Sequence, residues 1–311
     1  MMSLTTPMEM LTPSPINLNF DNLTTNTDLN MNIILNASFP HNITNVLTDD
    51  SFQDRDPAID FEVLRIRDLE YRNFPGSLSI ASWNCCGLKH KYHSIHNIFR
   101  LTGVDILVLN ETFRLPGVPW PRSLPPCLAE ATNSGSSSTR LANGVAVLVN
   151  PQSLGINGNI RNFSILNIDN VHGLKVVTKI NNLTLIAVYA PSSAGNELLT
   201  GFLSEATQLS SNQSPVVICG DLNITPINSV PTIPGRVRHF YQQLGANFFR
   251  ADTGEDATRP TNRVDAVNLD GNILDHFFGA HVSFDFSRCL NTFAHDSDHH
   301  PIMTRVSPMR L

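Results

Sequence analysis

Carboxylate, amide and imidazole side chains recur in this sequence directly after or before short runs of apolar residues. Asn84 follows the run Leu78–Trp83, and Asn110 and Glu111 follow Val104–Leu109. Polar groups at the ends of buried strands are how a rigid sheet presents a site at its rim. The other members of the series are Tyr189, Asp221, Asn223, Asp275, Asp298 and His299.

Together these side chains offer hard oxygen donors and one or two imidazoles, without a cluster of thiolates or of several histidines. This donor set disfavours zinc and favours Mg²⁺ or Mn²⁺. Mg²⁺ takes one or two carboxylates and keeps several waters, which leaves room for a phosphate oxygen. Because a metal ion, a general base and a histidine beside a phosphate are the parts of a phosphodiester hydrolysis site, the sequence predicts a metal-dependent phosphodiesterase.

The apolar runs that carry these residues are short, rich in β-branched side chains and separated by turn signals, as strands are. Amphipathic stretches at residues 91–101, 196–210 and about 235–245 predict helices. The predicted strands are Leu78–Trp83, Val104–Leu109, Gly144–Val149, Phe163–Ile168, Leu174–Ile180, Leu183–Tyr189, Pro215–Cys219, Ile273–Phe278 and Pro301–Val306.

This element order contains many strands, few helices and strand pairs without an intervening helix, which does not suit a pure βαβ fold. We predict an α/β (α+β) fold in which two stacked mixed β-sheets are flanked by helices. The predicted domain spans residues 77–308.

The N-terminal region differs from this domain in charge and composition. Residues 1–76 hold 11 acidic against 4 basic residues, a net charge of −7, whereas residues 77–311 hold 16 against 17, a net charge of +1. Residues 1–60 are rich in Asn, Thr, Pro and Asp and offer too little apolar surface to offset the entropy of ordering them. We therefore predict a disordered acidic tail over residues 1–60 and a linker over 61–76.

Cysteine content and hydropathy predict the cellular compartment of the protein. The five cysteines form no Cys-x-x-Cys pair, which favours reduced thiols over a disulfide framework. The start of the chain shows no signal peptide, and apolar runs such as Leu183–Ala190 are too short to span a membrane. We expect an intracellular protein, nuclear or cytoplasmic, that acts as a monomer and does not engage membranes.

Four short motifs identify a family resemblance. Ser82-Trp83-Asn84, Asn110-Glu111-Thr112, Gly220-Asp221-Leu222-Asn223 and Ser297-Asp298-His299 occur in the order and spacing of the endonuclease/exonuclease/phosphatase superfamily. The resemblance covers about residues 77–308 and implies a four-layer sandwich of the deoxyribonuclease-like type. The wider wording of residues 82–88, 105–112 and 297–302 is most similar to the endonuclease domains of non-long-terminal-repeat retrotransposons.

The resemblance also implies a metal site and the residue that activates water. It makes Glu111 the principal metal ligand, with Asn84 and Asp298 beside the metal. It makes Asp221 the residue that positions or deprotonates the attacking water. The implied cofactor is Mg²⁺ or Mn²⁺.

The remaining implied roles concern the phosphate. Asn223 and Tyr189 would hold it, and His299 would contact it or transfer a proton, with Asp275 fixing the imidazole ring. The family often carries a phosphate-contacting Thr before the Asp275 strand, a role that either Thr258 or Thr261 could fill.

Two groups of histidines have plainer interpretations. His90, His93 and His96 recur every three residues and suggest a metal site, but beside the apolar face of their helix they are better explained as a solvated stripe. His300 adjoins His299, and the spacing of the motif selects His299 as the functional imidazole.

The leading hypothesis for function is a Mg²⁺-dependent endonuclease that nicks DNA and leaves a 3′ hydroxyl. The nearly neutral domain lacks a Lys/Arg-rich run, so tight DNA binding must depend on clustering in space. Alternatives are a deadenylase, a phosphoinositide or sphingomyelin hydrolase, or a catalytically dead binding module. The stretch Ile-Leu-Asp-His at 273–276 departs from the Trp-Cys-Asp-Arg of 5-phosphatases and disfavours a phosphoinositide.

Overall fold

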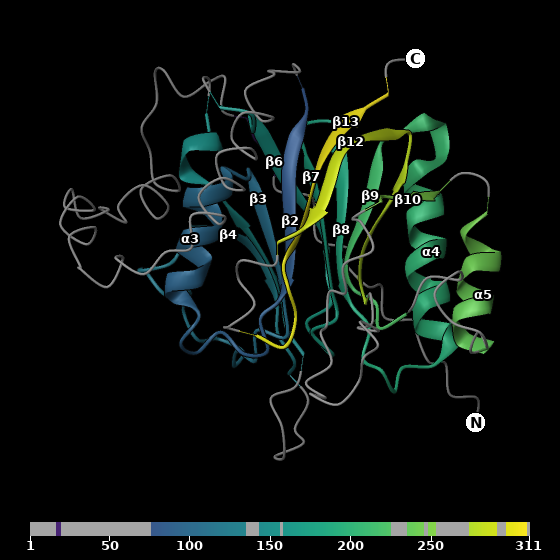
Figure 1. The fold of residues 1–311 in the computed structure, drawn as a ribbon, viewed down its shortest axis with the longest axis horizontal. Coiled ribbons are helices and arrows are strands. Elements are labelled where there is room, and N and C mark those ends of the chain that lie inside the picture. Colours follow the sequence, from purple (N-terminus) through teal and green to yellow (C-terminus); the bar gives the residue numbers. More distant parts are fainter. Residues whose placement is uncertain are drawn as a thin grey trace, which may run out of the picture.

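The structure is a computed structural model, and it describes residues 17–19, 76–134, 143–155, 158–224, 235–245, 248–252, 274–290 and 297–309. Two β-sheets form the centre of the molecule, with helices outside them (Figure 1). Thr258, Thr261 and most of the predicted tail and linker lie outside the described residues.

One sheet has seven strands, and its central strands are β8 and β9, which run parallel. All its other neighbouring pairs are antiparallel. In spatial order the strands are β1 (Asn17–Asn19), β6 (Asn162–Ile168), β7 (Lys175–Ile180), β8 (Leu183–Tyr189), β9 (Val216–Asp221), β11 (Asp275–Ala280) and β10 (Phe249–Arg250).

The second sheet has six strands and repeats this plan, with one parallel pair, β2 and β3, among antiparallel neighbours. Its spatial order is β12 (Val282–Cys289), β13 (Ile302–Pro308), β2 (Leu78–Asn84), β3 (Ile106–Asn110), β5 (Val145–Val149) and β4 (Cys127–Ala131). Two parallel strands run in the same direction, so their C-terminal ends lie at the same edge of the sheet. Each sheet therefore presents two C-terminal strand ends at one edge.

Helix α3 (Tyr92–Thr102) covers the outer face of the six-stranded sheet, and α4 (Asn196–Ser210) and α5 (Gly235–Leu244) lie on the far side of the other (Figure 1). Strand alternation explains these layers. Ile106 and Val108 of β3 face the core between the sheets, whereas Leu107 and Leu109 pack with α3. Short 3₁₀ helices, η4 (Pro151–Ser153) and η5 (Ser211–Gln213), complete the described elements.

The predicted architecture of two stacked mixed sheets flanked by helices is confirmed. All nine predicted strands and all three predicted helices are present, with ends that shift by one or two residues. Strands β1, β4, β10 and β12 were not predicted. None of the helices in the described residues has the length and apolar character needed to cross a membrane.

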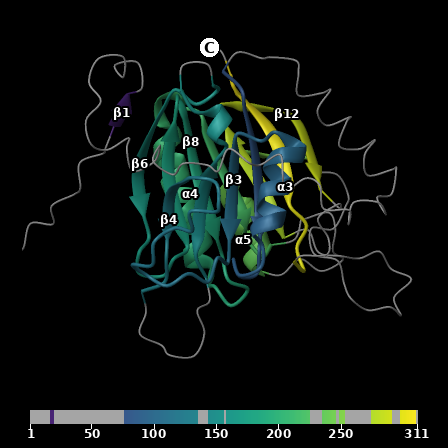
Figure 2. The same cartoon turned by 90° about the vertical axis from the view of Figure 1, so that its left-hand side faces the viewer.

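Within the predicted tail, β1 pairs with the outer strand β6 over three residues, Asn17 to Asn19 (Figure 2). The domain boundaries at residues 60 and 76, and the disorder expected over residues 1–60, stay predictions.

Candidate active site

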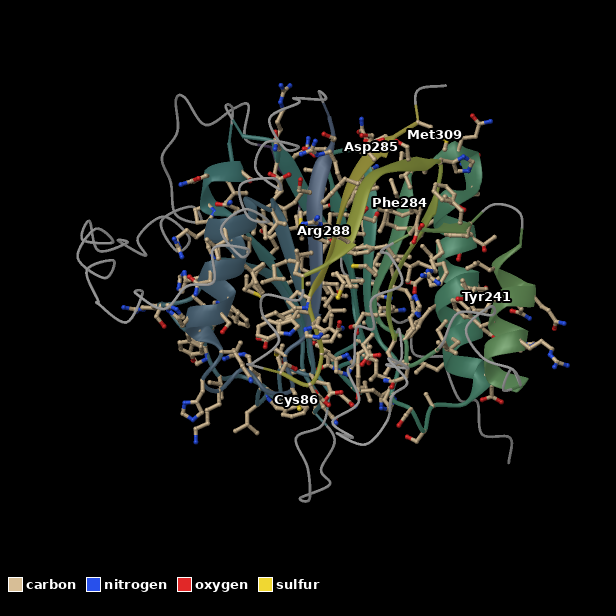
Figure 3. The ribbon with its side chains drawn as sticks, in the orientation of Figure 1. Cys86, Tyr241, Phe284, Asp285, Arg288 and Met309 are labelled. Carbon is tan, nitrogen blue, oxygen red and sulfur yellow. The ribbon has the colours of Figure 1, made fainter. Side chains whose placement is uncertain are left out.

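The polar residues singled out in the sequence meet at one edge of the two sheets. Asn84 pairs with Asn110 at the ends of β2 and β3, and Tyr189 pairs with Asp221 at the ends of β8 and β9. Asp275 begins β11 directly opposite Asp221. Figure 3 marks this edge by Cys86 and the opposite edge by Asp285 and Met309.

Asn110 joins the two sheets at this edge. Its Nδ2 donates to the Val188 carbonyl at 2.8 Å, and its Oδ1 accepts from the Asp221 amide at 3.3 Å. The approach needs Gly220, which has φ +140°, because a Cβ there would lie 1.8 Å from the Val188 oxygen. Sequence analysis placed Asn110 at the rim but gave it no role. The signal in the sequence was an uncharged polar residue, Asn110, at the end of an apolar strand.

Two carboxylates converge on the side-chain amide of Asn84, which is 2 % exposed. Its Nδ2 donates to Glu111 Oε1 at 2.9 Å and to Asp221 Oδ2 at 2.8 Å. Its Oδ1 accepts from the Cys86 amide at 3.0 Å. In this arrangement Asn84 holds the two carboxylates in place, one from each sheet.

On the other side of Asp221 lies a carboxylate–imidazole pair. His299 Nδ1 is 2.7 Å from Asp275 Oδ2, and its Nε2 is 3.9 Å from Asp221 Oδ2. Both ends of the pair are buried, Asp275 completely and His299 with 3 % exposure. With a carboxylate on Nδ1, the ring presents Nε2 toward Asp221.

The backbone around His299 is anchored from β2. Trp83 Nε1 donates to the His299 carbonyl at 3.0 Å. The Ser297 hydroxyl donates to the Asn84 carbonyl at 2.8 Å and accepts from the His299 amide at 3.2 Å. The Ser-Asp-His motif is thereby fixed to the strand that ends in Asn84, and it carries the half-buried Asp298 beside it.

Several carboxylates lie close together in this buried site, and the pKa values of Asp221 and His299 are raised as a result. Burial, and then the neighbouring Asp275 carboxylate, raise the pKa of Asp221 to about 7. For His299, burial opposes the charged form, but Asp275 and Asp221 outweigh it and raise the pKa to about 9. The imidazole is therefore cationic at neutral pH.

Asn223 and Tyr189 flank Asp221 from the seven-stranded sheet. The Asn223 amide donates to Asp221 Oδ1 at 2.9 Å, and its side chain donates to the Ala190 carbonyl at 3.0 Å. The Tyr189 hydroxyl is hydrogen-bonded to Glu111, and burial followed by that carboxylate raises its pKa above the usual range. The phenol therefore stays protonated and can donate a hydrogen bond.

The positions of the other histidines could not be predicted from their spacing in the sequence. His300 is 8 % exposed and, like His299, precedes β13 rather than belonging to it. His276, which sequence analysis did not single out, is buried, and its Nε2 lies 2.7 Å from the Ile224 carbonyl beyond Asn223. His90, His93 and His96 are exposed, and His96 Nε2 lies 2.5 Å from the Ser123 carbonyl.

The donor set fits a hard divalent cation. Glu111, Asp221 and Asp275 bring three carboxylates to one imidazole, and a divalent cation would offset the burial and the neighbouring Asp275 charge that together raise the pKa of Asp221. Ligand atoms of Asp221, Asp275 and His299 lie within 4.8 Å of one another, but the hydrogen bond between Asp275 and His299 already uses one atom of each. Cys85 does not compete, because burial raises the pKa of its thiol to about 12.

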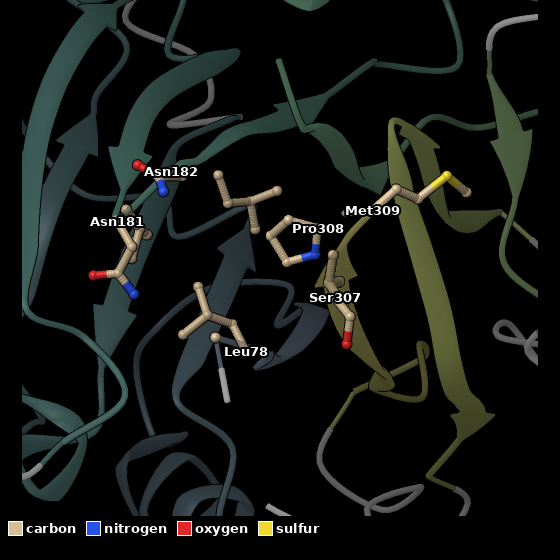
Figure 4. A pocket seen from close by; sticks show the side chains of 10 residues that line it. Leu78, Asn181, Asn182, Ser307, Pro308 and Met309 are labelled. Atoms are coloured by element: carbon tan, nitrogen blue, oxygen red, sulfur yellow. The ribbon is translucent and has the colours of Figure 1, made fainter. Parts of the chain in front are cut away.

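A separate hollow of about 510 Å³ opens at the opposite edge of the sandwich (Figure 4). It is lined by Leu78, Leu183 and Pro308 with two asparagines, Asn181 and Asn182. Its described lining holds no carboxylate, imidazole or thiol, in contrast to the rim at the other edge.

The fold and this rim define a phosphoester hydrolase that works with a divalent metal. Residues 81–299 match the Endonuclease/Exonuclease/phosphatase family, and the chain belongs to that family. Its members are generally dependent on divalent metal ions. A search of curated protein sequences found no match to this chain.

Solved structures with the same fold include two nucleic-acid enzymes. The 3′ phosphatase NExo from Neisseria, bound to a product DNA hairpin, is 16 % identical with a TM-score of 0.53, and the match covers 73 % of this chain and 98 % of that one. An AP endonuclease from Archaeoglobus fulgidus is 18 % identical with a TM-score of 0.52 and the same coverage, 73 % and 98 %. At these identities the likeness establishes the fold.

Proposed function

We propose that this protein is a Mg²⁺-dependent endonuclease that nicks DNA and leaves a 3′ hydroxyl. The observation that carries the proposal is an unbroken series of polar contacts across the joint between the sheets. The series runs Glu111–Asn84–Asp221–His299–Asp275.

Glu111, with Asp298 and Asn84 beside it, would hold the metal ion. A bound Mg²⁺ supplies positive charge next to the phosphate, where negative charge grows in the transition state. Asn84 keeps Glu111 and Asp221 at a fixed separation by donating to both.

Asp221 takes the proton from the attacking water in this proposal. Its pKa, raised to about 7, suits a group that must accept a proton near neutral pH. The Asn223 amide holds one carboxylate oxygen and the Asn84 amide holds the other, which fixes the direction from which the carboxylate meets the water.

His299 contacts the phosphate through Nε2, because its Nδ1 is occupied by Asp275. As a cation it stabilises the charge that develops on the phosphoryl oxygens. The Tyr189 hydroxyl and the Asn223 side chain supply further donors from the other side of Asp221. Thr258 or Thr261 is assigned to the phosphate by the family pattern alone.

DNA is the proposed substrate for two reasons. The two solved structures named above are, by their descriptions, a 3′ phosphatase bound to a product DNA hairpin and an AP endonuclease, and the motif wording is most similar to retrotransposon endonuclease domains. The departure at residues 273–276 speaks against a phosphoinositide. We further propose that the protein acts as a monomer inside the cell, in the nucleus or cytoplasm.

The test is a panel of substrates offered to the purified chain with Mg²⁺: supercoiled plasmid, an abasic duplex, single-stranded DNA, polyadenylated RNA and a soluble phosphoinositide. We expect nicking of duplex DNA, with nicks that a polymerase extends directly, as a 3′ hydroxyl allows. The matched control is Asp221→Asn, which keeps the shape of the side chain and removes the base. Preferential hydrolysis of the RNA or the phosphoinositide would replace DNA by that substrate, and the same rate in Asp221→Asn would refute the site.

A further inference from the structure

Strand β11 presents two adjacent polar side chains to opposite faces of the seven-stranded sheet. Asp275 points toward the second sheet, where it contacts His299. His276, the next residue, points to the other face, as strand alternation requires, and its ring centre lies 5.5 Å from that of Phe278. Phe278 in turn packs against two rings of helix α5, which lies on this side of the sheet (Figure 1). His276, which is 1 % exposed, is therefore buried on the helix-covered face.

From this face, His276 reaches the turn that follows β9. Its Nε2 lies 2.7 Å from the Ile224 carbonyl oxygen, and both residues are buried. A carbonyl oxygen only accepts hydrogen bonds, so Nε2 carries the hydrogen and the imidazole is the donor. The contact joins residues that are 52 positions apart in the chain, and it fixes the backbone one residue beyond Asn223.

A second hydrogen bond holds the other end of this turn. The Leu222 amide donates to the Leu274 carbonyl at 3.1 Å, so the chain at the start of β11 holds the turn on both sides of Asn223. Between these two anchors Asn223 has φ +49°, in the left-handed region that residues other than glycine adopt at a cost. Such a conformation persists when the surrounding contacts enforce it, and these two hydrogen bonds are contacts of that kind.

The backbone conformation of Asn223 decides where its polar groups lie. Its amide donates to Asp221 Oδ1 at 2.9 Å, and its Nδ2 donates to the Ala190 carbonyl at 3.0 Å. The first bond fixes one oxygen of the proposed base, and the second holds the side chain that the proposed function assigns to the phosphate. Both bonds depend on the backbone angles of one residue, so a change of the turn would displace the donor and disturb the base together.

We propose that His276 is a positioning residue of the reaction, which acts on the substrate through Asn223. The proposal rests on the proposed function and adds to it a residue on the far face of the sheet. Without the donor at the Ile224 carbonyl, the turn relaxes from its left-handed conformation and Asn223 moves away from its contacts. Displacement of such a group by about 1 Å can cost about 10²-fold in rate. Asp275 and His276, consecutive residues of β11, then each position one of the side chains assigned to the phosphate.

The test compares two variants of His276 that carry the same amide group and differ in reach. His276→Gln can place its amide nitrogen where Nε2 lies and keeps the donor, whereas the side chain of His276→Asn is too short to reach the Ile224 carbonyl. On the best substrate of the panel, we expect His276→Asn to lower kcat about 10- to 100-fold with KM changed less than about threefold. His276→Gln should stay within about threefold of the wild type.

The matched control is Phe278→Leu, which alters packing two residues further along the same face of β11. It should lower the melting temperature and leave kcat unchanged, because Phe278 contacts helix α5 and not the turn. If His276→Asn does not fold, His276→Leu suits the apolar surroundings and takes its place as the variant without a donor. An equal kcat in the wild type and the variant without a donor would overturn the proposal, and so would equal losses in His276→Gln and His276→Asn.

A double-mutant cycle tests the route through Asn223. If His276 acts through that residue, adding His276→Asn to Asn223→Ala should slow single turnovers by less than about threefold beyond Asn223→Ala alone, because the positioned group is already gone. Losses that multiply in full would show that His276 acts by another route and would overturn the proposal.

A further readout does not depend on turnover. Hydrogen exchange of the Asn223 amide, followed by NMR, should be faster in His276→Asn than in the wild type, His276→Gln or Phe278→Leu, because the turn that holds this amide against Asp221 has loosened. Unchanged exchange in His276→Asn would overturn the proposal at its first step. A wild-type protein that is inactive on every substrate of the panel would instead refute the proposed function, whatever the exchange rates show.

Discussion

At the residue scale, hydrogen-bond donors lie between the carboxylates of the site and hold these like charges close together. Asp221 accepts from Asn84 and Asn223 on different oxygens, and Asp275 lies against the His299 ring. Glu111 stands apart because it is half-buried and shares only the Asn84 amide and the Tyr189 hydroxyl with the rest. This exposure suits Glu111 to a metal ion that must exchange with solvent.

The first prediction follows for Glu111. Glu111→Gln should abolish activity at ordinary Mg²⁺ concentrations, because the neutral amide loses the charge that holds the ion. Folding should survive, since a half-buried rim residue contributes little core packing. Activity should be measured over a range of Mg²⁺, with a thermal melt of each protein. Full turnover of the variant in saturating Mg²⁺ would show that the ion is held elsewhere.

The second prediction separates the two adjacent histidines. His299→Ala should lower turnover about 10²–10³-fold, the usual effect of removing one charge-stabilising donor from a transition state. The spacing of the Ser-Asp-His motif selects His299 as the functional imidazole, so His300→Ala should cost less than about tenfold, through packing. Turnover of both variants and their melting temperatures provide the check. The assignment of the motif fails if His300→Ala is the inactive protein.

The third prediction concerns pH. Because His299 acts as a cation and its pKa is raised to about 9, activity should persist at neutral pH and fall as pH rises through that value. Asp275→Asn removes the main cause of the raised pKa, so the alkaline limb of kcat/KM should move to lower pH. A profile that drops in height without moving would mean that Asp275 has a structural role alone.

At the scale of elements, β8 and β9 meet so closely that the backbone admits no side chain at Gly220. A Cβ there would lie 1.8 Å from the Val188 oxygen and 3.3 Å from Asn110 Nδ2, the two atoms that join the sheets. The parallel pair at the centre of the sheet is therefore also what holds Asp221 against β3.

The fourth prediction tests this contact. Gly220→Ala should destabilise the fold by more than about 2 kcal/mol, because backbone at φ +140° must move to admit the methyl group. Gly201→Ala is the control, since it lies within α4 with nothing near its added Cβ, and it should be stabilising by about 0.5–1 kcal/mol. Urea unfolding of the two variants measures both effects. Equal stability would contradict the close contact.

At the scale of the whole molecule, the two sheets share one continuous core, and the described N-terminal contribution is the short strand β1 at the sheet edge. Three residues of edge pairing contribute little beside the twelve other described strands and the two interior faces of the sandwich.

The fifth prediction is that a chain beginning at residue 60 keeps full nicking activity and a cooperative melt. The acidic segment it lacks offers little apolar surface for a core. Specific activity and calorimetry of the shortened and full chains give the comparison. Aggregation or loss of cooperativity in the shortened chain would show that residues 1–59 pack against the domain.

Much of the fold could be read from the sequence because its signals are local. Apolar runs such as Leu183–Tyr189 define a strand completely, and the predicted bounds of β8 agree with those observed. Strand β12 was missed because the residues between its two ends, Ser283 to Arg288, are half-buried or exposed and do not alternate regularly. Pairing with β13, the next described strand along the chain, makes it a strand.

The sequence by itself determined which polar residues lie at the ends of strands. These are Asn84, Glu111, Asp221, Asp275 and His299, and their oxygen donors indicate the chemistry of the site. Only the tertiary structure decided how they act on one another. Asn84 and Asp221 are 137 residues apart in the chain, yet they share a hydrogen bond of 2.8 Å. The same packing joins the sheets through Asn110 and sets the pKa values of Asp221 and His299. Such effects depend on burial and on distances of a few ångströms. The strength of an electrostatic interaction changes so steeply with both that sequence spacing cannot predict it.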